Sequence, residues 1–195
     1  NICKKFKNIK IYSLKNKKRG EVLNYGISKS KGDIIVTFPS DNEYLAQDII
    51  KIINQLYLKD TFVVYGSRMI KNYKHTTHLK KIYKNNYLLY WISKIGGLLI
   101  SLLILVFYNK YISDPFTSLK AFRSETIKDI KNNFKGVDYD IYQIIQLTKK
   151  RVYINEIEVN YFARSYKEGK KTNIIEGLKS LLVIFRSLFF NSKMN

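Results

Sequence analysis

Two carboxylates stand two residues apart within the stretch from Thr37 to Asp48, and this spacing suits metal and phosphate chemistry. Asp41 and Glu43 follow a short β-branched and aromatic run, so we expect them just past the carboxyl end of a buried strand. Ligands of open α/β sheets bind at this edge. Both side chains can turn toward one hard cation and, through it, toward phosphate oxygens. The alternative interpretation is that they only cap and solvate a turn between a strand and a helix.

The elements that must position these carboxylates alternate between strands and helices. The expected strands are, in order, 9–12, 33–38, 61–65, 119–122 and 152–161. The expected helices between them include 21–30, 48–56 and 141–150. Strands that alternate with helices of this length predict βαβ units and a mixed, mostly parallel sheet flanked by helices.

The charge balance of the 195-residue chain points to an anionic partner. Lys and Arg number 35 against 15 Asp and Glu, which gives a formal net charge of +20. A membrane surface, a nucleotide-bearing substrate or a nucleic acid could each meet such a charge. The basic residues are scattered among motifs and not interleaved with aromatics, so nucleic acid is not expected. The single cysteine, Cys3, excludes an internal disulfide framework and suits a reducing compartment.

Two apolar segments could meet a membrane. Tyr87 to Tyr108 contains a 14-residue apolar run from Ile95, which is short of the roughly 20 residues that span a bilayer. This segment predicts either a packed helix or one that lies in the membrane interface. The closing segment 174–190 is amphipathic and favours membrane association. We therefore divide the chain into a domain at 1–171 and a C-terminal amphipathic helix at 172–195.

Several short motifs follow one another in an order that is more specific than any one of them. They are Gly32-Asp33, Gly66-Ser67-Arg68, the run from Asp114 to Arg123, Glu156-Ile-Glu-Val159, and Arg164 with Gly169-Lys170-Lys171. From about residue 12 to 190 this ordered set resembles the family 2 glycosyltransferases of GT-A type. Within that family it resembles the polyprenyl-phosphate (dolichyl-phosphate) mannose and glucose synthases. The resemblance implies a Rossmann-like GT-A fold and a nucleotide-sugar donor.

The chain departs from the family pattern in places. In the alignment that we prefer, Pro39 stands where the family has the first Asp of its Asp-x-Asp motif, which makes Asp41 the second; the other alignment makes Asp41 the first and Glu43 the second. Ser118 stands where Gly is usual, and Tyr142 where Glu is usual. The family's first two strands, with much of its base-binding pocket, have no counterpart before Asn1. We therefore expect an N-terminally truncated GT-A domain.

The resemblance also implies roles for single residues. Asp41 and Glu43 would hold Mg²⁺ or Mn²⁺, with Asp41 counted as catalytic as well. Asp114 would be a second catalytic residue that orients the donor or the acceptor. The expected phosphate- or substrate-binding residues are Ser67, Arg68, Arg164, Lys170 and Lys171, with Asp140 as a possible accessory residue.

The implied reaction is inverting transfer of a sugar from a UDP- or GDP-linked donor to a polyprenyl phosphate at the cytoplasmic face of a membrane. The phosphate of such an acceptor is anionic at neutral pH, so no strong general base is required. One alternative keeps the fold but uses a saccharide acceptor, with Asp114 or Asp140 as the base. Another is a truncated, inactive, basic remnant that binds membranes.

Overall fold

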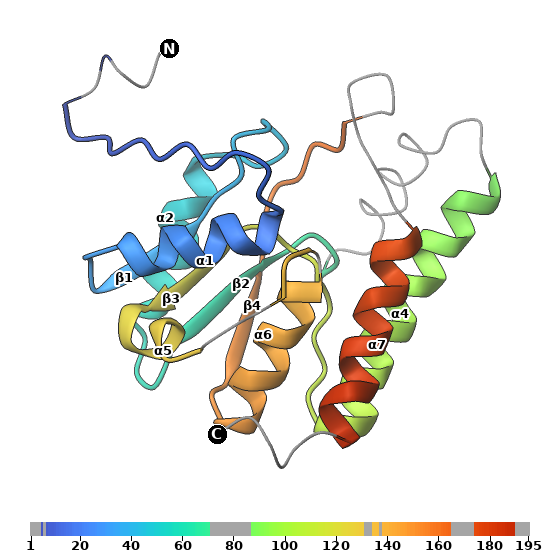
Figure 1. Cartoon of the computed structure of the whole chain (residues 1–195). Helices are drawn as coiled ribbons and strands as arrows, with labels where there is room; N and C mark the ends of the chain where they lie inside the picture. The colour runs from blue at the N-terminus through green and yellow to red at the C-terminus, as the bar shows by residue number, and fades with distance from the viewer. Residues whose placement is uncertain are drawn as a thin grey trace.

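One mixed sheet with helices on both of its faces makes up the computed structural model, which describes residues 5, 7–70, 87–130, 134–136, 138–164 and 174–189 (Figure 1). The strand order is β1-β3-β2-β4. The strands are β1 (Ile34–Thr37), β2 (Val63–Ser67), β3 (Lys120–Arg123) and β4 (Ile154–Glu158). The helices are α1 (Arg19–Lys29), α2 (Gln47–Leu56), α4 (Tyr87–Tyr108), α5 (Ser124–Lys128), α6 (Asp138–Lys149) and α7 (Ile174–Phe189).

Three of the four strands point the same way. β3 pairs antiparallel with both β1 and β2, and β2 pairs parallel with β4. The predicted mixed sheet is therefore confirmed, with β3 as the reversed strand. Because β3 runs backward, its first residue, Lys120, lies opposite Thr37 of β1 and Tyr65 of β2. This edge of the sheet thus gathers the carboxyl ends of β1, β2 and β4 and the loop that enters β3.

Strand alternation divides the core into two clusters, one on each face of the sheet. Val63, Tyr65 and Phe122 belong to the cluster that includes residues of α1, α6 and α7. Val64 and Ala121 belong to the cluster that includes Ile52 and Leu56 of α2. The five strand residues named here are all 0% exposed, so the sheet forms the middle layer between α2 and the larger group of helices.

Helices α4 and α7 lie side by side next to α6 (Figure 1). The Tyr108 hydroxyl donates to the Ile184 carbonyl at 3.1 Å, and the rings of Phe107 and Phe185 meet edge to face. By length and composition, the 19 residues from Tyr90 to Tyr108 could cross a membrane, which the 14-residue run in the sequence did not suggest. Ile184 of α7 belongs to the main core cluster. The predicted division of the chain between residues 171 and 172 stays a prediction.

The strand predicted at 9–12 is wrong. These residues form no regular element, and Ile9, Ile11 and Tyr12 are about half exposed. Alternation marks a strand only where a neighbouring strand supplies hydrogen bonds, and within the described part of the chain the sheet has no strand at 9–12. Tyr12 instead packs its ring edge to face on Tyr25 of α1.

The close approach of β2 to the segment after β4 gives a first prediction. A Cβ at Gly66 would lie 2.7 Å from a methyl group of Val159 and 3.3 Å from Leu119. Val159 is buried and β-branched, so it cannot move aside freely. We expect Gly66→Ala to lower the free energy of unfolding by about 1–3 kcal/mol.

The matched control is Gly26→Ala in α1, where a Cβ would meet nothing within 4 Å. Alanine is the better helix former by about 1 kcal/mol, so this variant should be neutral or more stable. Urea denaturation of both variants measures the difference. Equal stability of the two variants would contradict the close packing at Gly66.

Candidate active site

Arg68 directly follows β2, and its guanidinium binds the Asp114 carboxylate as a two-pronged fork. Nε donates to Oδ2 at 2.6 Å and Nη2 donates to Oδ1 at 2.7 Å. The Arg68 backbone N–H donates to Oδ2 as well, at 3.0 Å. Burial acts to lower the pKa of Arg68, but Asp114 and the nearby Tyr44 hold that pKa well above its ordinary value. Arg68 therefore stays charged, and both oxygens of the buried Asp114 are engaged.

The loop that carries Asp114 is fixed from beneath by β4. Glu156 accepts hydrogen bonds from the backbone N–H groups of Ser113 and Asp114, at 2.7 and 3.0 Å, and from the Ser113 hydroxyl at 2.9 Å. The Ser67 hydroxyl lies 2.7 Å from that of Ser113. Ser67 is completely buried in this conformation. Its predicted contact with a substrate phosphate stays a prediction.

Arg164 joins the two carboxylates of the acidic turn. Its Nη2 donates to Asp41 Oδ2 at 3.0 Å, while its Nε and backbone N–H donate to Glu43 Oε1 at 3.3 and 3.2 Å. The side chain of Glu43 is 6% exposed, whereas that of Asp41 is 29% exposed. Glu43 is therefore an internal acceptor, and Asp41 presents the more accessible carboxylate.

Tyr161 connects the acidic turn to the Arg68–Asp114 pair. Its hydroxyl donates to Glu43 Oε2 at 2.9 Å, and the guanidinium carbon of Arg68 lies 4.9 Å from its ring centroid. The ring also meets that of Tyr44 edge to face, and these two residues form an isolated antiparallel bridge. Burial raises the pKa of the Tyr161 hydroxyl well above its ordinary value, so it remains a donor. Sequence reasoning missed Tyr161, although it lies three residues before Arg164.

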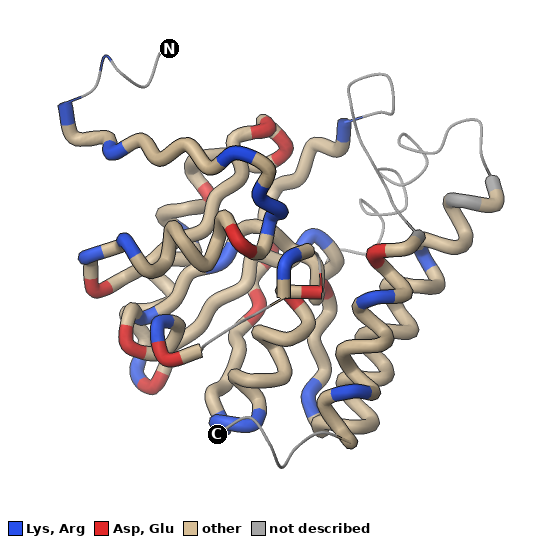
Figure 2. Tube along the Cα trace, in the orientation of Figure 1, with Lys and Arg blue, Asp and Glu red and all other residues tan. Residues whose placement is uncertain are grey.

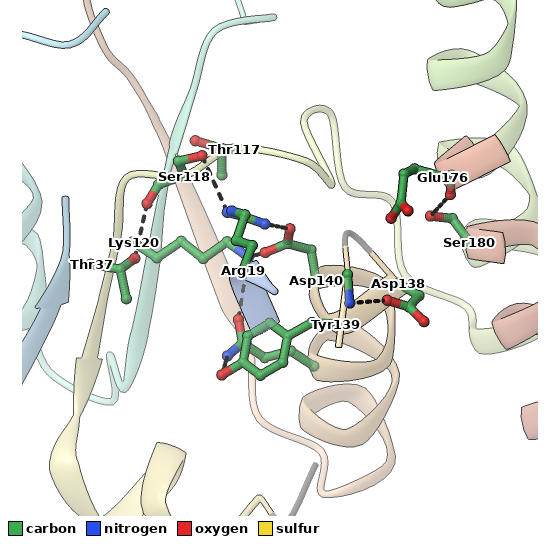
Figure 3. Close-up of polar contacts among 12 residues, drawn as sticks. Arg19, Thr37, Thr117, Ser118, Lys120, Asp138, Tyr139, Asp140, Glu176 and Ser180 are labelled. Atoms are coloured by element: carbon green, nitrogen blue, oxygen red, sulfur yellow. Dashed lines mark hydrogen bonds and ion pairs between the residues drawn. The ribbon is translucent and has the colours of Figure 1, made fainter. Parts of the chain in front are cut away.

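A second group of ionic side chains lies deeper, between α1, β3 and α6 (Figure 3). Lys120 Nζ donates to Asp140 Oδ1 at 2.6 Å, and Arg19 pairs with the other oxygen of Asp140. Arg19 also donates to the Ser118 hydroxyl at 3.2 Å, and the Thr37 hydroxyl donates to the Ser118 carbonyl at 2.9 Å. Ser118, where the family has Gly, thus gives Arg19 a partner beside the end of β1.

These contacts fix the protonation of the deeper group. Burial acts to raise the pKa of Asp140, but Lys120 and Arg19 hold that pKa below its ordinary value. Burial lowers the pKa of Lys120 despite the pull of Asp140. Lys120 and Asp140 are almost fully buried, at 2% and 1% exposure. Asp140 is therefore a shielded, ionised carboxylate between two cations, a position that does not suit a base which must reach a substrate.

The structure brings most of the predicted site residues to one edge of the sheet. Lys170 and Lys171 lie outside the described residues. No site role was predicted from the sequence for Arg19, Lys120, Glu156 or Tyr161, although Lys120 and Glu156 lie within motifs. Lys120 could have been suspected, since it stands in a motif, but nothing local reveals that Lys120 and Arg19 both meet Asp140. Among the described residues, the edge holds four carboxylates and four cations in ion pairs.

The acidic turn matches the way magnesium is often held. In the described part of the chain no three His, Cys, Asp or Glu side chains gather as a metal site. Mg²⁺ commonly binds through one or two carboxylates, with substrate phosphates and water completing its shell. Asp41, supported by Glu43, fits that mode in donor type and number. Arg164 occupies oxygens of both carboxylates in this structure, so a cation would share or displace that contact.

The buried group between α1, β3 and α6 predicts a large stability effect. Asp140→Asn would leave the Lys120 ammonium buried without its carboxylate, and such a loss typically costs about 3–5 kcal/mol. We expect the free energy of unfolding to fall by that order. Thermal and urea denaturation would measure it.

Asp129→Asn is the matched control, because Asp129 also pairs with a lysine, Lys150, but its side chain is 74% exposed. An exposed pair is largely screened by water, so this variant should change stability much less. Similar losses in the two variants would mean that Asp140 is hydrated and that the deeper group is not a packed unit.

The chain is similar in sequence and in fold to known proteins. The chain is 28% identical over 149 residues to a UDP-N-acetylglucosamine--dolichyl-phosphate N-acetylglucosaminyltransferase of Methanococcus voltae, a match that covers 75% of this chain and 55% of the relative. Mannosyl-3-phosphoglycerate synthase of Rubrobacter xylanophilus is 13% identical with a TM-score of 0.61, covering 91% of this chain and 53% of that one.

A further solved structure is glucosyl-3-phosphoglycerate synthase of Mycobacterium tuberculosis in complex with Mn²⁺, UDP-glucose and glycerol 3-phosphate. It is 12% identical with a TM-score of 0.55, covering 89% of this chain and 56% of that one. The two likenesses to solved structures confirm the predicted GT-A fold. The chain spans a little over half the length of each of these three proteins.

The family model described as glycosyl transferase family 2 matches residues 1–130. That match is more than half of the chain and takes in the acidic turn, the Arg68–Asp114 pair and all of β3. The chain therefore belongs to glycosyl transferase family 2.

Proposed function

We propose that this chain is the metal-binding and acceptor part of an inverting transferase that moves a sugar from a nucleoside diphosphate to a polyprenyl phosphate. The acceptor oxygen would attack the anomeric carbon as the bond from that carbon to the diphosphate breaks, and the nucleoside diphosphate would leave. The reaction would take place at the cytoplasmic face of a membrane. Mg²⁺ or Mn²⁺ bound at Asp41 and Glu43 would neutralise charge on the leaving diphosphate.

The choice of a phosphate acceptor rests on one observation: both carboxylates considered as a general base are committed to cations. Asp114 gives both oxygens to Arg68, and Asp140 lies buried between Lys120 and Arg19. A hydroxyl acceptor must lose a proton during attack and needs a base within hydrogen-bond reach. An acceptor phosphate is already anionic, so this site suits it better than a saccharide hydroxyl.

The arginines of the edge have separate tasks in this proposal. Arg68 is held by the buried Asp114, so it would act as a fixed charge that positions phosphate or sugar near the end of β2. Arg164 is 36% exposed at its side chain and could turn from Asp41 to a diphosphate oxygen. Forked hydrogen bonds to phosphate oxygens are a typical use of arginine. The predicted phosphate contacts of Lys170 and Lys171 would add to this charge.

The archaeal relative supports the same acceptor class, because its name describes transfer of N-acetylglucosamine to dolichyl phosphate. The mycobacterial structure with Mn²⁺ and UDP-glucose supports a divalent ion and a nucleotide-sugar donor. We therefore take UDP-N-acetylglucosamine as the first donor to test, with UDP-glucose and GDP-mannose beside it.

Loss of the exposed carboxylate should weaken donor binding and transfer. Asp41→Asn keeps the size of the side chain but removes the charge that a cation needs. We expect Mn²⁺-dependent transfer to fall by about 10²-fold, the usual effect of losing one group that stabilises developing charge. Calorimetric titration of each nucleotide-sugar, with Mn²⁺ and then with EDTA, measures the binding step.

The control for this variant is Asp60→Asn, which makes the same chemical change in an exposed loop on the far side of α2 from the acidic turn. Asp60 has a positive φ of 58°, which asparagine tolerates well. Its transfer rate should match that of the unchanged chain. If Asp41→Asn still binds the nucleotide-sugar in a metal-dependent way, Asp41 is not a ligand of the proposed cation.

The acceptor class can be tested by deleting the acceptor's phosphate. We expect sugar transfer from the radiolabelled donor to polyprenyl phosphate but none to the matching polyprenol, because Asp114 and Asp140, the two carboxylates considered as the base, are both held by cations. Thin-layer separation of lipid-linked product measures both reactions. Comparable transfer to polyprenol, or to a soluble saccharide, would overturn the phosphate-acceptor assignment while leaving a glycosyltransferase.

A further inference from the structure

Tyr161 contacts the acidic turn with its hydroxyl and Arg68 with its ring. The hydroxyl donates to Glu43 Oε2 at 2.9 Å, and the guanidinium carbon of Arg68 lies 4.9 Å from the ring centroid. Tyr161 is 7% exposed, and its ring meets that of Tyr44 edge to face at 5.2 Å between centroids. Packing of the ring therefore fixes the place of the hydroxyl, which is what a precise binding site requires of its supporting side chains.

The acidic turn is attached to the segment 161–164 through Glu43. The Phe162 backbone N–H donates to the Glu43 carbonyl at 2.8 Å, and the Arg164 backbone N–H donates to Glu43 Oε1 at 3.2 Å. Asp41 Oδ1 accepts from the Glu43 backbone N–H at 3.2 Å. The contacts that hold Glu43 therefore also set where the more accessible Asp41 carboxylate lies.

The Tyr161 hydroxyl holds Glu43 even if the side chain of Arg164 moves. Two contacts of Glu43 Oε1 come from Arg164, one from its backbone N–H and one from Nε at 3.3 Å. The Arg164 side chain is 36% exposed, so its Nε can leave when a cation or a diphosphate arrives. Oε2 keeps its contact, because the Tyr161 hydroxyl is buried and belongs to a packed ring. The carboxylate therefore keeps one orientation while its other oxygen changes partners.

A neutral donor suits a carboxylate that is to bind a cation. Figure 2 shows Lys and Arg along most of the elements of a chain whose net charge is +20. A further charged donor at Glu43 would repel a divalent ion, whereas the Tyr161 hydroxyl adds no charge. The ring has the opposite task, since its face attracts the guanidinium of Arg68. One side chain thus supports a cation site on one side and a fixed cation on the other.

We propose that Tyr161 is a positioning residue of the cation site, whose hydroxyl fixes the Glu43 carboxylate for the cation and whose ring keeps Arg68 beside it. This inference rests on the proposed function for the presence of a cation at Asp41 and Glu43. Loss of a hydrogen-bonding partner of a metal-binding carboxylate typically weakens metal binding by roughly 10- to 100-fold. Hydroxyl and ring act on different groups, so mutation can separate their effects.

Tyr161→Phe isolates the hydroxyl, because phenylalanine keeps the ring against Arg68 and Tyr44. We expect the affinity for Mn²⁺ to fall by roughly 10-fold or more. Titration of Mn²⁺ alone, and again with UDP, measures this by electron paramagnetic resonance of the free ion, without sugar transfer. Saturating Mn²⁺ should then return the transfer rate to that of the unchanged chain, because the defect is one of affinity. A merely structural defect would not be corrected by more metal.

Tyr44→Phe is the matched control, since it removes a buried hydroxyl from the same pair of rings. That hydroxyl lies 3.4 Å from Thr117 Oγ1 and accepts from the Ser118 N–H at 3.3 Å, and neither group is a carboxylate. The affinity for Mn²⁺ should therefore stay unchanged, and urea denaturation checks that both variants are folded. Equal weakening of Mn²⁺ binding in Tyr44→Phe and Tyr161→Phe would reduce the effect to general loosening and overturn the proposal.

Tyr161→Leu removes the ring as well, so Arg68 loses the aromatic face that holds it. We expect this variant to show the same loss of Mn²⁺ affinity and, in addition, a lower transfer rate that saturating Mn²⁺ does not restore. Full restoration of Tyr161→Leu by Mn²⁺ would contradict the role of the ring, and failure to restore Tyr161→Phe would contradict the role of the hydroxyl.

The outcomes distinguish this role from the proposed function. A chain whose Mn²⁺ binding depends on the Tyr161 hydroxyl but which transfers no sugar would count against the proposed function and not against the positioning role. Equal Mn²⁺ affinity in Tyr161→Phe and in the unchanged chain would overturn the positioning role and leave the proposed function standing. If the unchanged chain binds no Mn²⁺, with or without UDP, the positioning role and the proposed cation site are both wrong.

Discussion

The fork between Arg68 and Asp114 is the interaction on which the rest of the site depends. A buried carboxylate without a partner is strongly destabilising, so this pair forces the end of β2 and the loop before β3 to meet. Glu156 and Ser67 then hold the loop from beneath, and the guanidinium of Arg68 rests on the ring of Tyr161. Through the Tyr161 hydroxyl the constraint reaches Glu43 and the acidic turn. One ion pair thus sets the relative positions of three segments that are distant in sequence.

The ion pairs at this edge differ in how easily they can open. Lys120 and Asp140 are buried, and separating them would leave unsolvated charges, so they act as fixed structure. Arg164 and Asp41 are about one-third exposed at their side chains, and an ion pair in such a setting contributes roughly 1 kcal/mol or less. A diphosphate or a cation can exchange with this outer pair at little cost. The site therefore combines a rigid, buried ion pair with one ion pair that can open, Arg164 with Asp41. In the proposed function, the donor phosphates would arrive at this second pair.

Local patterns in the sequence were enough for most elements and for the family, because helix periodicity, strand composition and the order of motifs are properties of neighbouring residues. The segment 9–12 failed, since alternation over four residues does not reveal whether a partner strand exists. Partners of charged residues were equally hidden. Arg19 and Asp140 are 121 positions apart, and their pairing follows from how α1 and α6 pack. For the same reason the hydrogen bonds of Asp114 to Arg68 were not foreseen, and its expected role in orienting the donor or the acceptor stays a prediction.

Charge is distributed unevenly between the site and the remaining surface, and this bears on how an anionic partner is captured. At the described site, carboxylates and cations balance in pairs, so the site itself exerts little long-range attraction. Most of the +20 excess must then act from elsewhere, including Lys94 of α4 and Lys179 and Arg186 of α7. Such a field would attract an anionic partner toward the protein without competing for the site. In the proposed function, specific recognition of phosphate would fall to short-range exchange at Arg164, which would take effect only once a substrate has reached the edge of the sheet.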